Sequence, residues 1–210
     1  MKLVVFGSTG RVGSSIVMQA LDAGHQVSAY ARPASVGSLP PGVEVHEGGL
    51  DDVGAIAKAV AGADAVLSGL GARKNTADQA PMLSGAYERI CQAMTDAGVK
   101  RLVAISGSAT RLPDEPVAFG RRILRGVMKL LGRHMLRANE AAAAVILGTQ
   151  LEWVLVRPPL IKDGGPTGSR AASLRATPSM HITVGDVAGF MLESARSDEW
   201  VREAPFVAAV

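Results

Sequence analysis

Three glycines spaced three residues apart lie near the start of the chain, at Gly7, Gly10 and Gly13. A short apolar segment, residues 2–6, precedes them, and apolar residues recur at helical spacing after them. A strand, a glycine turn and a helix in this order present free backbone N–H groups and the positive end of the helix dipole to an anion. We therefore predict that this segment holds the pyrophosphate of a dinucleotide.

Each glycine has a separate task in such a turn. Gly7 makes the sharp exit from the strand, Gly10 lets the backbone approach the pyrophosphate, and Gly13 lets the helix pack closely on the sheet. Because glycines also punctuate turns that bind nothing, the inference depends on the strand and helix around the motif. The predicted phosphate contacts are Gly7, Thr9, Gly10, Arg11, Val12 and Gly13.

The end of the second predicted strand, residues 26–30, decides which dinucleotide fits. A site for NAD usually offers Asp or Glu there to hold the ribose 2′-hydroxyl, whereas this chain offers Arg32. A guanidinium is a permanently charged fork that suits a 2′-phosphate, so we predict NADP, with NADPH preferred over NADH. Arg11 and Ser35 could assist. The alternative is that Arg32 is only a solvated loop residue.

Strand and helix patterns alternate along the rest of the chain. Further strands are expected at residues 43–47, 64–68, 100–105 and 153–157, with an edge strand at 206–209. Helices are expected at residues 52–61, 81–97 and 184–195 and from Asn139 onward. This alternation predicts an α/β fold, a single doubly wound Rossmann domain with a mostly parallel sheet. The domain is expected to cover residues 1–210, with the substrate region contributed by 110–135 and 160–180.

The loop after the fourth predicted strand contains Gly69, Leu70 and Gly71. Loops at the carboxyl ends of parallel strands line the ligand crevice of this fold. Two glycines let the backbone lie close to a ribose or a nicotinamide, so these three residues are predicted cofactor contacts.

The chain resembles a known group of enzymes in several segments. GSTGRVG and the strand ending in YAR resemble the atypical short-chain dehydrogenase/reductase superfamily, in its NmrA-like branch. Resemblance to the biliverdin-IXβ reductase/flavin reductase family is carried by LGARKN (70–75), VKRLVAISGSA (99–109), WVLVRPP (153–159) and ITVGDVAGFML (182–192). It covers nearly the whole chain and is weakest over 110–150 and 162–180. It implies a Rossmann fold and an NAD(P)-binding oxidoreductase.

The resemblance implies further cofactor contacts. In the family, a Gly-Asp pair and an apolar residue after the third strand cover the adenine. Here Gly49 replaces the Asp, so such a contact would come from the backbone or from Leu50. Pro159 and Leu160 fall in the segment that lies against the nicotinamide in the family.

Typical short-chain dehydrogenases use a serine after the fifth strand and a downstream Tyr-x-x-x-Lys motif that supplies a proton. Tyr30 and Tyr87 are the only tyrosines; both lie upstream, and neither is followed by lysine four positions on. That acid mechanism is excluded, as in the flavin-reductase type, where hydride transfer needs mainly proximity and orientation. Ser106 and Ser108 could hydrogen-bond the nicotinamide or the acceptor, or could cap a turn. His134 is a candidate proton donor or a surface histidine.

These observations predict an NADPH-dependent oxidoreductase that passes hydride to a small planar acceptor, such as a flavin or a quinone. The alternative is a non-catalytic NADP(H)-binding redox sensor of the NmrA-like regulatory type, because the missing Tyr/Lys pair fits both. A nucleotide-sugar epimerase or dehydratase is disfavoured by the absent tyrosine and the short substrate region.

Composition disfavours several other classes. A net charge of +3 with only two Trp, two Tyr and four Phe does not favour nucleic-acid binding. The lone cysteine, Cys91, forms no internal disulfide and is expected to be a buried core thiol. His25 and His46 form no ligand spacing, so no metal site is expected. No apolar run is long enough to span a membrane, and we expect a soluble cytoplasmic protein, a monomer or a homodimer.

Two segments of the predicted substrate region carry charged patterns. Basic residues recur four apart at Arg121, Arg125, Lys129, Arg133 and Arg137. This stripe is either a solvated helix face or a surface for an anionic membrane or an acidic partner; Gly126 and Gly132 weaken the helix and favour the first. The glycine-rich residues 163–179 suggest a mobile substrate loop, where Arg170 and Arg175 could meet an acidic substrate or simply solvent.

Overall fold

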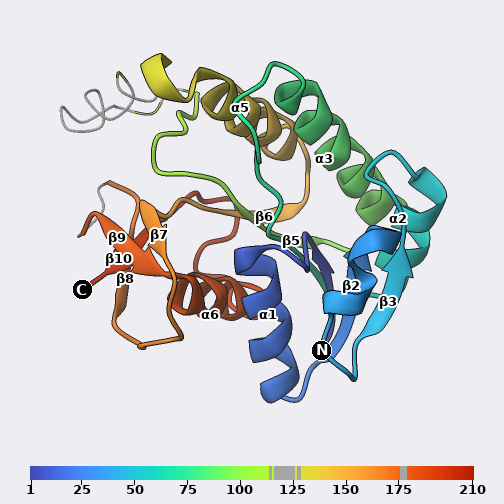
Figure 1. Cartoon of the computed structure of the whole chain (residues 1–210). Coiled ribbons are helices and arrows are strands. Elements are labelled where there is room, and N and C mark those ends of the chain that lie inside the picture. The colour runs from blue at the N-terminus through green and yellow to red at the C-terminus, as the bar shows by residue number, and fades with distance from the viewer. Residues whose placement is uncertain (114, 116–125, 127–128, 176–178) are drawn as a thin grey trace.

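A computed structural model describes residues 1–113, 115, 126, 129–175 and 179–210. Its centre is a six-stranded parallel sheet in the order β3-β2-β1-β4-β5-β6 (Figure 1). The strands are β1 (Lys2–Phe6), β2 (Gln26–Ala31), β3 (Glu44–Glu47), β4 (Ala65–Ser68), β5 (Arg101–Ile105) and β6 (Glu152–Val156). Because the strand order reverses between β1 and β4, the doubly wound Rossmann fold is confirmed.

Helices cover both faces of the sheet. One face packs against α1 (Arg11–Asp22) and α6 (Val184–Ser194), and the other against α2 (Val53–Val60), α3 (Gln79–Asp96) and α5 (Arg133–Leu147). Within β1, Leu3 and Val5 belong to the core under α1 and α6. Val4 and Phe6 belong to the core under α2, α3 and α5. Burial on both faces explains why the strands read as continuous apolar runs.

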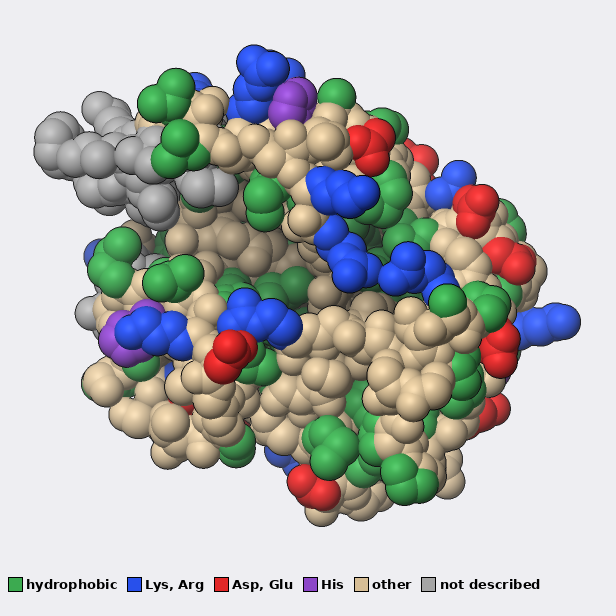
Figure 2. All heavy atoms as spheres, viewed as in Figure 1, with side chains coloured by type: hydrophobic (Ala, Val, Ile, Leu, Met, Phe, Trp, Pro, Cys, Tyr) green, Lys and Arg blue, Asp and Glu red, His purple; other side chains and the backbone are tan. Residues whose placement is uncertain are grey.

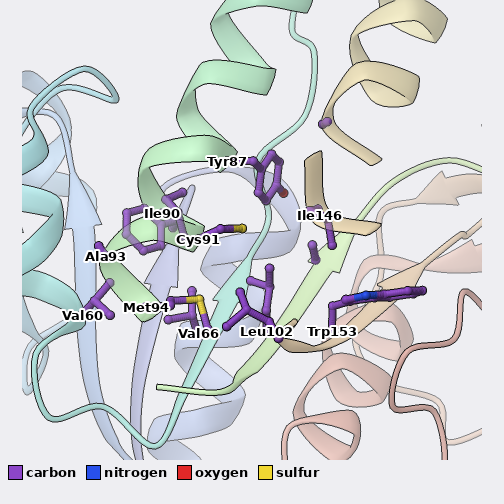
Figure 3. Packing of buried hydrophobic residues seen from close by; sticks show 14 of the residues in the cluster. Val60, Val66, Tyr87, Ile90, Cys91, Ala93, Met94, Leu102, Ile146 and Trp153 are labelled. Atoms are coloured by element: carbon purple, nitrogen blue, oxygen red, sulfur yellow. The ribbon is translucent and has the colours of Figure 1, made fainter. Parts of the chain in front are cut away.

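The core under α3 is shown in Figure 3. Tyr87 and Met94 of α3 point towards Val66 of β4 and Leu102 of β5. Cys91 lies in the same cluster, and burial raises the pKa of its thiol to about 12. The expected buried core thiol is therefore confirmed.

Two small sheets lie beside α6 (Figure 1). β7 (Leu160–Lys162) pairs in parallel with β9 (His181–Thr183), and β8 (Arg170–Ser173) pairs antiparallel with β10 (Phe206–Ala209). Part of the segment expected to be a loop, 163–179, is thus a strand, because β10 supplies its hydrogen-bond partners. The strand at 206–209 is present with the predicted bounds.

Other element boundaries shift for local reasons. α5 begins at Arg133 rather than Asn139, because Gly132 (φ −137°, ψ 34°) breaks the chain direction just before a run of good helix formers. Within the loop expected after β2 lies the 3-10 helix η1 (Pro33–Ser38). Of the basic stripe, Arg121 and Arg125 lie outside the described residues. In the described part of the chain, no helix has the length and apolar character needed to cross a membrane.

Candidate cofactor and acceptor site

The glycine turn packs against the loop after β4. Gly7 has a φ of +69°, and its carbonyl accepts the N–H of Gly10 at 2.9 Å. A Cβ on Gly13 would lie 2.0 Å from the carbonyl oxygen of Gly7, and a Cβ on Gly69 would lie 3.0 Å from the amide nitrogen of Gly13. The start of α1 therefore approaches the carboxyl ends of β1 and β4 so closely that only glycine fits at Gly13.

The N-terminus of α1 is open. Gly10 is its N-cap residue, and no side chain caps the helix. The first N–H groups of a helix lack partners within it, so they are free to bind an anion at this end. Gly10 and Thr9 are exposed, while Val12 is buried against the sheet. An uncapped helix start beside a glycine turn suits a pyrophosphate, and the individual phosphate contacts stay predictions.

Arg11 carries a charge that is already paired. Its Nε and Nη2 atoms donate to Oδ1 of Asp163 at 3.0 and 2.6 Å, and Nη2 also donates to the carbonyl of Ile161 at 3.2 Å. A depression of about 310 Å³ lies beside this pair, against Ser14 and Met18 of α1. The sequence did not reveal Asp163 as a partner, since 152 residues separate it from Arg11.

Arg32 directly follows β2 and is exposed. Within the described residues, its guanidinium has no hydrogen-bond partner, whereas its carbonyl accepts the N–H of Ser35 at 2.8 Å. Arg32 thus presents its cation at the carboxyl end of β2, and its binding to a 2′-phosphate stays a prediction.

The loop after β3 is fixed from two sides. The hydroxyl of Tyr30 donates to the carbonyl of Gly49 at 2.7 Å, and Nη1 of Arg89 donates to the carbonyl of Leu50 at 3.3 Å. Burial, with the nearby Asp52 and Asp51 charges, raises the pKa of Tyr30 to about 12. Tyr30 therefore holds the loop as a hydrogen-bond donor. Arg89 was not singled out in the sequence.

The loop that carries Gly69 and Gly71 extends across to α5. Oε1 of Gln79 accepts the N–H groups of Arg73 and Lys74 at 3.0 and 3.3 Å, which shapes the loop. Beyond them, Nδ2 of Asn75 donates to the carbonyl of Leu131 at 2.9 Å, and Oδ1 accepts the N–H of His134 at 2.9 Å. Asn75 thus caps the start of α5 from a distant loop, a role that sequence reasoning missed.

The two candidate serines lie between the ends of β5 and β6. The N–H of Ser106 donates to the carbonyl of Val156 at 2.8 Å, and that of Ser108 to the carbonyl of Pro158 at 3.0 Å. These bonds bring both serines beside the segment that contains Pro159. The Oγ of Ser106 lies 2.9 Å from Oγ1 of the buried Thr110, which the sequence did not single out.

The proton-transfer candidates are spread apart. The hydroxyl of Tyr87 is buried and lies 2.8 Å from Oγ of Ser68, and burial raises its pKa. His134 lies in the first turn of α5, where its Nε2 accepts from Nε of Arg133 at 3.2 Å. Across the described residues, no hydrogen bond joins His134 to Ser106 or Ser108. A donor role for His134 stays a prediction.

A buried ion pair fixes the chain just after β6. Nη1 of Arg157 lies 2.8 Å from both carboxylate oxygens of Glu115, and its Nε donates to the carbonyl of Ala204 at 2.8 Å. The same guanidinium lies 3.9 Å from the ring centroid of Phe206. The sequence did not single out this pair, which ties the end of β6 to two segments far away in the chain.

Asp186 organises the segment before β8. Its carboxylate is buried and accepts from the N–H and hydroxyl of Thr167, the N–H of Gly168 and the hydroxyl of Thr183 at 2.7–3.0 Å. Burial alone would raise the pKa of Asp186, but these hydrogen bonds outweigh it and hold the pKa below its usual value. Thr183 caps α6 by accepting the N–H of Asp186 at 3.0 Å.

Figure 2 shows this face of the molecule hollowed between the loops at the carboxyl ends of the strands, with Lys and Arg side chains along part of the rim. A planar group bound there would lie between the glycine turn on one side and α5 on the other. The arrangement therefore suits an anionic dinucleotide beside a second, smaller molecule.

Comparison with known proteins agrees with this geometry. A family model described as NAD(P)H-binding matches residues 7–198. A curated protein of Streptomyces griseus, named (4-alkanoyl-5-oxo-2,5-dihydrofuran-3-yl)methyl phosphate reductase, is 28% identical over 184 residues, which are 88% of this chain and 56% of that protein. The chain thus spans little more than half the length of this relative.

Solved structures show the same fold. The oxidoreductase ylbE of Lactococcus lactis is 23% identical with a TM-score of 0.81, covering 100% of this chain and 91% of that one. ChuY, an anaerobilin reductase of Escherichia coli, is 20% identical with a TM-score of 0.82, covering 100% and 97%. A short-chain dehydrogenase/reductase of Veillonella parvula in complex with NADP is 15% identical with a TM-score of 0.79, covering 99% and 94%.

Proposed function

The chain belongs to the NAD(P)H-binding family, and from that premise we propose that it is an NADPH-dependent oxidoreductase that passes hydride to a small planar acceptor such as a flavin or a quinone. The observation that carries this proposal is the glycine cradle, in which Gly13 tolerates no Cβ and the start of α1 is uncapped. The curated relative, named as a reductase of a phosphorylated dihydrofuran, supports a small ring-shaped acceptor.

In this proposal the bound cofactor supplies the hydride, and the chain supplies position. The N–H groups at the start of α1 bind the pyrophosphate, and Arg32 binds the 2′-phosphate. Ser106, Ser108 and Pro159, held together between the ends of β5 and β6, orient the reacting ring. Orientation of this kind lowers the barrier without a dedicated acid, which suits a site that lacks the Tyr/Lys pair.

Protonation of the reduced acceptor needs a separate source. Tyr30 and Tyr87 are excluded, because their hydroxyls are occupied and their pKa values are raised. We assign this role to His134 or to solvent, and unchanged turnover in a His134→Gln variant would favour solvent.

The preference for NADPH is tested at Arg32. We expect Arg32→Asp to lower kcat/KM for NADPH on the order of 10- to 100-fold while NADH is affected little, because a charge-assisted bond to the 2′-phosphate is lost. The assay is oxidation of NADPH and of NADH in parallel against a panel of flavins and quinones.

Arg196→Asp is the matched control. Arg196 is exposed and follows α6, next to residues 194 and 197, whose carbonyls bind Arg101 at the amino end of β5. It therefore lies at the opposite end of the sheet from the cofactor. Unchanged cofactor selectivity in Arg32→Asp would refute the assignment. Tight NADPH binding without turnover on any acceptor would instead favour the redox-sensor function.

A further inference from the structure

Two adjacent leucines project from the molecule where the predicted basic stripe meets α5. Leu130 and Leu131 are 82% and 70% exposed, and they lie in a helical turn, residues 129–131, just before Gly132. Single exposed apolar side chains are common, but contiguous ones rimmed by polar or charged residues are typical of interaction surfaces.

Basic side chains surround the two leucines. Lys129, Arg133 and Arg137 are exposed, and the two arginines share a face of α5 because they are four residues apart. In Figure 2 most of the acidic side chains lie along the right side of the molecule. We call residues 129–131, Arg133 and Arg137 the Leu130 corner; it combines a projecting apolar pair with positive charge.

The apolar surface continues on the other side of the hollow. Leu160 and Met180 are exposed and adjacent, since the N–H of Leu160 donates to the carbonyl of Met180 at 3.2 Å. Figure 2 shows hydrophobic side chains on both sides of the hollow, over the turn before α5 and over β7 and β9. The mouth of the hollow is thus bordered by apolar groups from two distant parts of the chain.

We propose that the Leu130 corner docks on an anionic lipid surface. The projecting leucines would insert among the acyl chains of the lipids. The charged ends of Lys129, Arg133 and Arg137 would reach the anionic lipid headgroups. A second copy of the chain fits worse, because a two-fold contact would bring Lys129, Arg133 and Arg137 near their own counterparts. The contact is peripheral, since in the described residues no helix is able to cross a bilayer.

Docking in this way turns the mouth of the hollow towards the lipid. An acceptor dissolved in the bilayer would then reach the site directly, and this consequence alone rests on the proposed function. Vesicle binding is measured without turnover, so its outcome is independent of whether the protein reduces anything.

The test is sedimentation of the full chain with vesicles of phosphatidylcholine alone and with vesicles that also contain phosphatidylglycerol. We expect binding to the anionic vesicles only, weakened by salt. Leu130→Asp/Leu131→Asp and Lys129→Glu/Arg133→Glu should each lower the partition coefficient by about tenfold or more. The exposed Val53→Asp on α2 (61% exposed) is the matched control and should bind like the wild type.

Circular dichroism and NADPH affinity establish that each variant is folded. The proposal is overturned if the wild type fails to bind anionic vesicles at low salt, or if the leucine and charge variants bind as well as Val53→Asp. It is also overturned if sedimentation velocity shows a dimer that the leucine variant dissociates, because a second copy then covers this corner.

Discussion

The two sides of the candidate site are built in different ways. On the cofactor side, backbone meets backbone: Gly7, Gly13 and Gly69 come so close that a Cβ would collide with a neighbouring main chain. On the acceptor side, side chains join distant segments, as Asn75 joins α5 and Arg157 joins Glu115. The difference teaches that the core of the cofactor side, the glycine turn, is encoded by a local motif, whereas the described contacts of the acceptor side join segments that only the complete fold brings together.

The largest effect is expected on the cofactor side, for Gly13→Ala. Its Cβ would lie 2.0 Å from the carbonyl oxygen of Gly7, so the main chain of α1 or of the turn must move. We expect the free energy of unfolding to fall by about 3 kcal/mol, with loss of NADPH binding. Denaturant titration and fluorescence titration with NADPH measure the two effects.

Gly37→Ala is the control, because a Cβ there meets nothing within 4 Å. It should change the free energy of unfolding by less than about 1 kcal/mol and leave NADPH binding intact. Equal behaviour of the two alanine variants would contradict the close approach of the backbones as the defining feature of the cofactor side.

On the acceptor side, we expect the largest loss of stability from Glu115→Gln. This change removes the negative charge that lies 2.8 Å from the buried Arg157 guanidinium and puts a neutral amide in its place, so a charge-assisted hydrogen bond becomes a weaker one. We expect a loss of about 2–3 kcal/mol in the free energy of unfolding and a raised KM for the acceptor, with NADPH affinity little changed. The exposed Glu199→Gln is the control. A loss of NADPH affinity equal to the change in acceptor KM would break the distinction between the two sides.

Sequence reasoning succeeded where a signal is local and failed where a contact is long-range, on both sides of the site. The glycine spacing and apolar runs predicted the fold, the strand ends and the turn, because these signals lie within about thirty consecutive residues. Asp163, Glu115 and Asn75 were missed, since each finds its partner only after folding. The early start of α5 has a local cause in Gly132, and a long-range contact that the sequence does not reveal adds to it: Asn75, 59 residues away, binds the first turn.

A third prediction concerns acid stability at Asp186. Its folded-state pKa lies below its usual value, so its contribution to stability is complete above the usual carboxyl pKa and is lost as the pH falls through the lowered one. In Asp186→Asn an NH2 group, which only donates, replaces one of the two accepting oxygens, so some of the surrounding N–H and O–H donors lose their acceptor. We therefore expect the free energy of unfolding to fall by about 2 kcal/mol at neutral pH. In denaturant titrations from neutral to acid pH, the free energies of unfolding of the wild type and of Asp186→Asn should converge. A constant difference across this range would mean that the carboxylate charge is not involved.

The smallest effect is expected for Asn75→Ala, and it probes the link between the two sides most directly. The substitution removes the bonds to the Leu131 carbonyl and the His134 N–H, both exposed, so the free energy of unfolding should fall by only about 1 kcal/mol. If Asn75 positions α5 over the acceptor, the acceptor KM should rise several-fold while kcat and NADPH affinity stay nearly constant. Asn75→Asp keeps an oxygen that accepts the N–H of His134. It should therefore bring the KM for the substrate part of the way back to the wild-type value, which loss of stability alone would not do.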